Sequence, residues 1–181
     1  MSLEDNSLNQ IIIVKMKNRM TLFGCGPKLA LLCLPYIILS LIIMIKYPEF
    51  FDMRFLDFPL FKVFGIIWLG LGLIFWIYSA VYFLKYFKPG TLITKGPFAL
   101  CRNPIYSSII VFIIPALAII FHSGLTLSIA LVLYIGFKIS IHGETSVLRK
   151  IFGEEYDVYE KSVNELFPFP LHLFPRMRIK H

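Results

Sequence analysis

Four long apolar runs constrain the fold of this chain more than any other feature of its sequence. They extend over Leu29 to Tyr47, Val63 to Leu84, Tyr106 to Phe121 and Leu125 to Ile141. An α-helix needs about 20 apolar residues to cross a hydrocarbon core of ~30 Å, and each run approaches or reaches that length. The mean hydropathy of +0.75 agrees with burial in lipid. We therefore predict an all-α integral membrane protein with about four transmembrane helices.

The last two runs are predicted to form a tight helical hairpin, because only His122, Ser123 and Gly124 separate them. So short a connection makes the two helices antiparallel neighbours. Pro115 is expected to kink the first of them. No linker-like stretch rich in Ser, Gly or Pro divides the chain, so we expect a single domain over residues 1–181.

The polar stretches at the two ends of the chain are predicted to lie on the membrane surface. Residues 1–28 contain one apolar run too short to span, which indicates an interfacial segment. An amphipathic helix is expected to begin at Gly143 and to end at Gly153, and a second helical segment follows over Glu154 to Asn164. We expect these two segments to form a helical cap.

Basic residues determine the predicted orientation. Lys85, Lys88, Lys95 and Arg102 lie between the second and third runs with no acidic residue among them. The positive-inside rule places this loop in the cytoplasm, together with the cap and, for four spans, both termini. The basic residues that give the net charge of +7 are then expected to contact anionic lipid headgroups. Nucleic acid is a poor partner, because the aromatic residues lie in or beside the apolar runs.

Cysteine and histidine spacings indicate neither a disulfide framework nor a metal site. The three cysteines form no CxxC pair, and the four histidines form no HExxH pattern. We expect no bound metal.

Two polar regions, the stretch from Lys88 to Tyr106 and the helix expected from Gly143, should converge at the cytoplasmic mouth of the hairpin. Its helices run out and back, so Arg102 and Glu144 are expected to lie near each other. The residues of these regions form an ordered series: Gly96-Pro97-Phe98, Arg102-Asn103-Pro104-Ile105-Tyr106, Glu144, Leu148, Phe152-Gly153-Glu154-Glu155-Tyr156 and Tyr159. This series resembles the integral-membrane methyltransferase superfamily, which includes isoprenylcysteine carboxyl methyltransferases and phospholipid-methyltransferase-like proteins.

The resemblance covers residues 88–168 and implies a methyltransferase that uses S-adenosylmethionine. The implied acceptor is lipid-like or prenylated, either an isoprenylcysteine carboxylate or a lipid amine, and enters from the bilayer. Arg102 and Glu144 are implied as catalytic residues, since a guanidinium can hold a carboxylate and a carboxylate can balance a sulfonium. The residues implied around the cofactor are Thr91, Leu92, Ile93, Phe98, Asn103, Pro104, Tyr106 and Glu144.

The chain departs from the resembled superfamily at three positions. Asn103 stands where many members have His, and asparagine cannot act as a general base near neutral pH. Thr145 stands where others have a second acid beside the glutamate. Ser140 stands where the prenylcysteine enzymes have a substrate-binding arginine, with Lys138 as a candidate substitute. The acceptor therefore stays open.

Two other functions also stay open. One is a sterol-reductase-like membrane enzyme that uses NADPH, although such proteins resemble a longer chain with more spans. The other is a non-enzymatic small helical transporter or scaffold, which would carry polar residues near mid-bilayer. His142, Tyr156 and Tyr159 are interpreted as interfacial or packing residues.

Overall fold

The computed structural model describes residue 24, residues 26–53 and residues 58–168. The interfacial segment predicted for residues 1–28 lies largely outside these described residues. Every regular element within the described residues is helical, which confirms the all-α prediction. The elements are α2 (Gly26–Lys46), the 3-10 helix η1 (Pro48–Phe51), α3 (Pro59–Tyr86), the 3-10 helix η3 (Gly96–Ala99), α4 (Pro104–Ser107), the π-helix η4 (Ser108–Ile113), α5 (Ile114–Ile120), α6 (Gly124–Phe152) and α7 (Glu154–Ser162).

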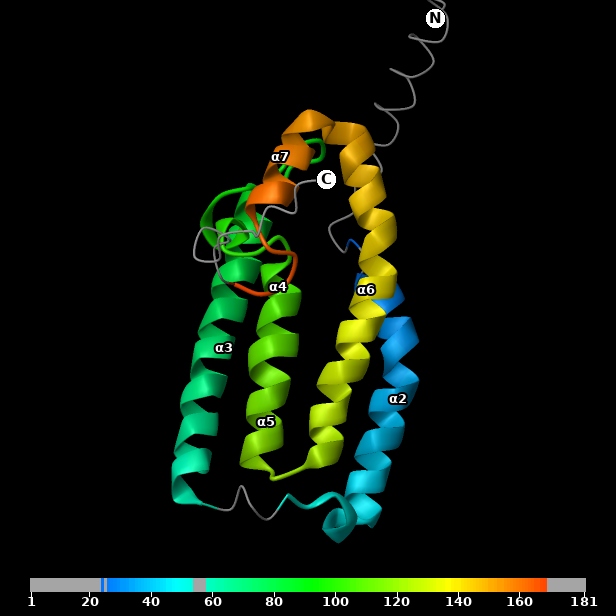
Figure 1. Ribbon diagram of the computed structural model, residues 1–181, viewed down its shortest axis with the longest axis vertical. Helices are drawn as coiled ribbons and strands as arrows, with labels where there is room; N and C mark the ends of the chain where they lie inside the picture. The colour runs from blue at the N-terminus through cyan, green and yellow to red at the C-terminus, as the bar shows by residue number, and fades with distance from the viewer. Residues whose placement is uncertain (1–23, 25, 54–57, 169–181) are drawn as a thin grey trace, which may run out of the picture.

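The long helices stand side by side in the order α3, α5, α6, α2 (Figure 1). Helix α6 packs against α2 and α5, and α3 packs against α5 and η4. The outward sides of the edge helices are apolar, with Leu31 80% and Leu60 77% exposed. Exposure of this extent is expected for side chains that face lipid tails.

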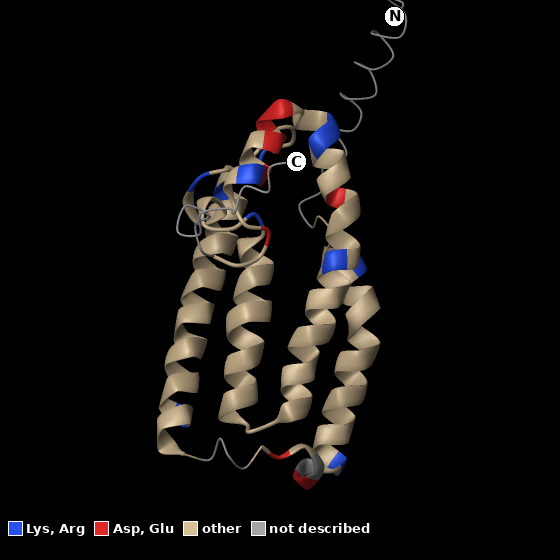
Figure 2. Cartoon of the chain, in the orientation of Figure 1, with Lys and Arg blue, Asp and Glu red and all other residues tan. Residues whose placement is uncertain are grey.

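Among the described residues, three helices are long and apolar enough to cross a membrane: α2, α3 and α6. The apolar helical segment Pro104–Ile120, which comprises α4, η4 and α5, is shorter. Charged residues gather at the ends of the helices and are sparse along their middle (Figure 2). These features are those of an integral membrane protein.

The predicted hairpin is confirmed, since α5 ends at Ile120 and α6 begins at Gly124. The Ser123 hydroxyl caps α6 by accepting a hydrogen bond from the Thr126 amide at 3.2 Å. Gly153, with φ +55°, ends the same helix as predicted.

The prediction that a new helix begins at Gly143 is wrong, because α6 continues through this position to Phe152. One glycine costs a helix only about 1 kcal/mol, which the neighbouring residues offset. The 29 residues of α6 extend over about 44 Å, more than a hydrocarbon core requires. The C-terminal part of α6 therefore continues beyond the apolar zone and carries polar residues to the site.

The third predicted span is irregular in its middle, where η4 immediately precedes the first residues of α5. Pro115 has no N–H to donate to the Val111 carbonyl four residues earlier. The indole Nε1 of Trp68 on α3 donates to that carbonyl instead, at 3.2 Å. Helix α3 and η4 approach closely at Gly72, where an added Cβ would lie 2.7 Å from Cβ of Phe112. The expected kink is thus a π-helix supported by a hydrogen bond from a neighbouring helix.

Candidate active site

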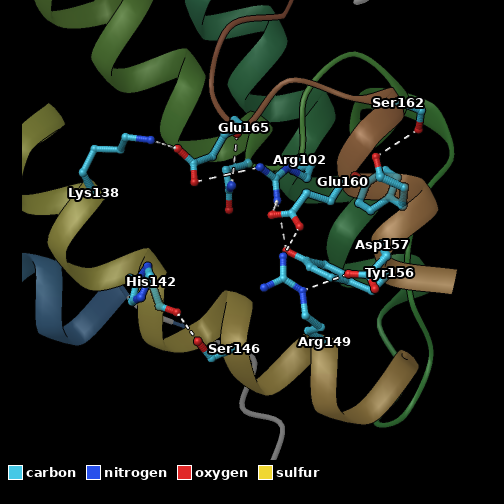
Figure 3. A network of polar contacts seen from close by, with 12 residues as sticks. Arg102, Lys138, His142, Ser146, Arg149, Tyr156, Asp157, Glu160, Ser162 and Glu165 are labelled. Atoms are coloured by element: carbon cyan, nitrogen blue, oxygen red, sulfur yellow. Dashed lines mark hydrogen bonds and ion pairs between the residues drawn. The ribbon is translucent and has the colours of Figure 1, made fainter. Parts of the chain in front are cut away.

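The Arg102 guanidinium reaches from the loop before α4 to the C-terminal cap (Figure 3). Its Nη1 donates to Oε1 of Glu160 at 2.8 Å and to the Tyr156 hydroxyl at 3.2 Å. Its Nη2 lies 4.0 Å from Oε1 of Glu165. The side chain is only 12% exposed, and its Nε is buried with no hydrogen-bond partner in the described part of the chain. One strong donor of the guanidinium is therefore unused in a water-poor environment.

The backbone around Arg102 pairs with the chain that follows α7. Cys101 and Asn164 form an isolated parallel bridge, and the Arg102 amide donates to the Asn164 carbonyl at 2.8 Å. Asn103 donates to the Glu165 carbonyl twice, from its amide N–H at 3.2 Å and from its side-chain Nδ2 at 3.1 Å. The asparagine thus holds the end of the cap onto the loop.

Ion pairs fasten α7 to α6 as well. Arg149 Nε donates to Asp157 at 2.9 Å, and Arg149 Nη2 pairs with Glu160. Burial alone would raise the pKa of the Glu160 carboxyl, but hydrogen bonds from Arg149 and Arg102 outweigh it and lower that pKa below its usual value. Glu160 is therefore ionised at neutral pH and is shared by two guanidinium groups.

Glu165 connects α6 to the loop in a similar way. Its carboxylate pairs with Lys138 on α6 and lies on the side of Arg102 opposite Glu160 (Figure 3). Lys138, the candidate substitute for a substrate-binding arginine, thus has an acidic partner. Ser140 is buried, and its hydroxyl has no hydrogen-bond partner among the residues that the structure describes.

Glu144 and Tyr106 form a second group at the same end of the bundle. Glu144 is half-buried on α6, and its carboxylate lies beside Gly24, just before α2. The Tyr106 ring packs against Phe137 of α6 with centroids 5.4 Å apart. Arg102 therefore contacts α7, whereas Glu144 lies next to the chain that leads into α2.

The other residues predicted around a cofactor lie in the loop before α4 or at its start. Leu92 packs against the buried cluster of Tyr156, Tyr159 and Val163, and the Phe98 carbonyl accepts a hydrogen bond from the Tyr159 hydroxyl at 2.7 Å. These two residues therefore lie against the cap. Pro104 is buried, Ile93 is half-buried, and Thr91 is exposed with its hydroxyl donating to the Lys88 carbonyl at 2.7 Å.

Two titratable groups in this region are held neutral by their surroundings. Burial raises the pKa of the Cys101 thiol to about 11. Burial also raises the pKa of the Tyr159 phenol above its ordinary value. Both groups keep their protons at neutral pH, so neither serves as a nucleophile or a general base.

Glu160 and Glu165 are partners of Arg102 that were not predicted from the sequence. For Glu160 a local signal existed, because it follows Tyr156 by four residues and so shares its helix face. Glu165 lies outside any helix, and no periodic pattern marks it.

An apolar cavity of about 450 Å³ lies between α2, α6 and the α4–η4–α5 segment. It extends from Leu29 and Tyr106 at the site end to Met44 and Phe121 at the other. Tyr106 therefore belongs both to the predicted site and to this cavity. The described residues contain no group of three or more His, Cys, Asp or Glu side chains that could hold a metal ion.

Comparison with known proteins indicates the family of this chain. Two rice proteins, from Oryza sativa subsp. indica and Oryza sativa subsp. japonica, are each 33% identical to this chain over 78 residues, and both bear the name "Probable protein-S-isoprenylcysteine O-methyltransferase". The aligned part covers 43% of this chain and 41% of each rice protein. No solved structure matches the chain significantly. Residues 61–155, just over half of the chain, match the phospholipid methyltransferase family. The predicted resemblance is thereby confirmed: the chain belongs to the phospholipid methyltransferase family.

Proposed function

We propose that this protein is a methyltransferase that uses S-adenosylmethionine as its donor and methylates a lipid-like or prenylated acceptor at the cytoplasmic face of the membrane. The position of Tyr106 is the observation that carries this proposal. Tyr106 lines the apolar cavity and follows Arg102 by four residues. One residue thus joins a polar end of the bundle to a cavity suited to a hydrocarbon chain.

The side chains at this end fit the chemistry of such a donor. The buried, unused Nε of Arg102 suits a carboxylate, and the Glu144 carboxylate suits a cationic amino or sulfonium group. Phe98 and Tyr106 offer aromatic faces to an adenine ring or a sulfonium. S-adenosylmethionine supplies an activated methyl group on a positively charged sulfur. The proposed cofactor-binding residues are Thr91, Leu92, Ile93, Phe98, Asn103, Pro104, Tyr106 and Glu144.

The contribution of the protein to the reaction is then alignment and exclusion of water. The acceptor chain lies in the apolar cavity, which keeps the acceptor head at the level of Tyr106. An acceptor carboxylate needs no base. An acceptor amine needs a group to take its proton, and the proposed group is Glu144, because Cys101 and Tyr159 stay protonated and Asn103 does not titrate.

The proposed topology has four membrane crossings, by α2, α3, α6 and the shorter α4–η4–α5 segment. Both termini and the loop with Lys85, Lys88 and Lys95 lie in the cytoplasm. The positive-inside rule supports this orientation, and the hydrogen bonds from Arg102 to α7 support a shared face for loop and cap.

Methyl-labelled S-adenosylmethionine tests the proposal. Membranes that contain the protein are incubated with it, and label is traced into lipid, protein and volatile fractions. We expect label in a lipid or prenylated product, with a loss of about 100-fold or more in Arg102→Ala and Glu144→Gln. Lys62→Ala, at the start of α3, and Glu154→Gln, on the exposed side of α7, are matched controls that should retain activity.

Unchanged transfer in both site variants would remove the proposed roles of Arg102 and Glu144. Binding of NADPH in preference to S-adenosylmethionine would instead favour the sterol-reductase-like alternative.

A further inference from the structure

Gly24, before α2, and Gly26, the first residue of α2, lie against two residues of the proposed site. A Cβ added at Gly24 would lie 2.9 Å from Oε2 and 3.0 Å from Oε1 of Glu144. A Cβ added at Gly26 would lie 3.1 Å from the hydroxyl oxygen of Tyr106. Both contacts join residues that are far apart in the sequence, so they exist only in the folded bundle.

Gly24 meets two separate demands at this contact. Its φ of +45° lies in the left-handed region, which residues with a side chain rarely adopt. The carboxylate of Glu144 also occupies the space that a side chain would need. Gly26 meets only the demand for space. These two residues, named here the glycine pair (Gly24 and Gly26), therefore place bare backbone against the site.

Electrostatic attraction to the N-terminal end of α2 also favours the position of the Glu144 carboxylate beside Gly24. The N-terminal end of a helix is electropositive, and the first turn of α2 carries no acidic residue. The Glu144 carboxylate, supplied by α6, lies beside that end. Attraction to the helix end and contact with Gly24 act on the same carboxylate.

We propose that the glycine pair is a positioning element of the methyl-transfer site, setting the Glu144 carboxylate and the Tyr106 hydroxyl by direct backbone contact. This inference rests on the proposed function of those two residues. Tyr106 also lines the apolar cavity with Leu29 of α2, so the pair orients the donor and acceptor parts of the site relative to each other. The family match begins at residue 61 and does not include this contribution from the N-terminal region.

The proposal is tested by substitutions that create a steric clash at each glycine and by second substitutions that remove the clashing atoms of Glu144 or Tyr106. Gly24→Ala and Gly26→Ala introduce the two clashes. Glu144→Asp withdraws the carboxylate by one methylene, and Tyr106→Phe removes the hydroxyl. Gly143→Ala is the matched control, because a Cβ at that position, next to Glu144 on α6, would meet nothing within 4 Å. Each single and double variant is assayed for its Tm without ligand, its Kd for S-adenosylmethionine, and kcat and KM.

We expect Gly24→Ala to weaken S-adenosylmethionine binding by about tenfold and Gly143→Ala to leave it unchanged. The double variant Gly24→Ala with Glu144→Asp should lose less binding relative to Glu144→Asp alone than Gly24→Ala loses relative to the wild type, because the contact is relieved although the backbone strain at Gly24 remains. Tyr106→Phe should relieve Gly26→Ala in the same manner but should not relieve Gly24→Ala. If the N-terminal region has only a structural role, the glycine substitutions should lower Tm, and the substitution of the contacting residue should not restore S-adenosylmethionine binding.

Two results overturn the inference, and they are distinguishable. A wild-type protein that neither binds S-adenosylmethionine nor transfers its methyl group overturns the proposed function and this inference with it. An active wild-type protein whose glycine variants match Gly143→Ala in Kd, kcat and KM, or whose double variants show purely additive losses, overturns the inference alone.

Discussion

The hydrogen bond between Trp68 and Val111 leads to a prediction that is specific to this bundle. Pro115 cannot donate to the Val111 carbonyl, and the Trp68 indole N–H does so from α3 at 3.2 Å. In Trp68→Phe, the aromatic contact with Phe112, whose ring centroid lies 4.9 Å away, is largely kept, but the donor is lost. Water cannot replace that donor in the lipid core, so the carbonyl is left unpaired.

The expected loss is about 1 kcal/mol, because interhelical hydrogen bonds in membranes contribute about 0.6 to 1.7 kcal/mol. Measuring Trp68→Phe in a Pro115→Ala variant as well isolates the contribution of this hydrogen bond. Pro115→Ala restores an N–H that can donate to the Val111 carbonyl within the helix, so the indole donor becomes redundant. In the Pro115→Ala background, Trp68→Phe should therefore cost only the difference in ring packing.

The assay is equilibrium unfolding in mixed micelles with increasing sodium dodecyl sulfate, followed by circular dichroism for the wild type, both single variants and the double variant. The four free energies of unfolding form a double-mutant cycle with an expected coupling of about 1 kcal/mol. A coupling near zero, with Trp68→Phe equally costly in both backgrounds, would refute the argument that the tryptophan replaces the donor that proline lacks.

Three further predictions concern packing, pH and thiol reactivity. Gly136→Ala should lower the free energy of unfolding by about 1–3 kcal/mol, because the added Cβ would lie 2.5 Å from Sγ of Cys33 on α2; the same unfolding assay should show no loss for Gly70→Ala, where the Cβ meets nothing within 4 Å. The pKa of Glu160 is lowered in the folded state, so its contribution to stability is present above the ordinary carboxyl pKa of about 4.3 and is lost as the pH falls through the folded value. Glu160→Gln should accordingly flatten the pH dependence of unfolding in that acidic range, and an unaltered profile would contradict the assignment. Cys101, buried and with a pKa of about 11, should resist iodoacetamide at pH 8 in the native protein and react once the protein is unfolded, as peptide mass spectrometry can measure.

Local features of the sequence were sufficient to predict the four apolar helical segments. Apolar runs of near-spanning length predict helices wherever they occur, because lipid leaves the backbone no other way to pair its polar groups. The three-residue connection at His122 to Gly124 predicted the hairpin, and Gly153 predicted the end of α6. The ordered motif from Gly96 to Tyr159 indicated the methyltransferase family before any contact was known.

The helical pattern was less informative where glycine and proline occur inside a helix. The sequence predicted a helix start at Gly143, but α6 continues through this position, because one glycine costs a helix only about 1 kcal/mol. Proline at 115 predicted a kink, but no local pattern predicted the π-helix before it or the hydrogen bond that Trp68, on another helix, donates to Val111.

The partners of the site residues were decided by tertiary structure alone. Arg102 pairs with Glu160 and Glu165, and Glu144 lies beside Gly24, although nothing in the spacing of these residues indicates it. Hydrophobic periodicity depends on the few residues of one helical turn, so it can be read along the chain. Contacts between distant side chains depend on which helices become neighbours and how closely they approach, and only the packed bundle determines both.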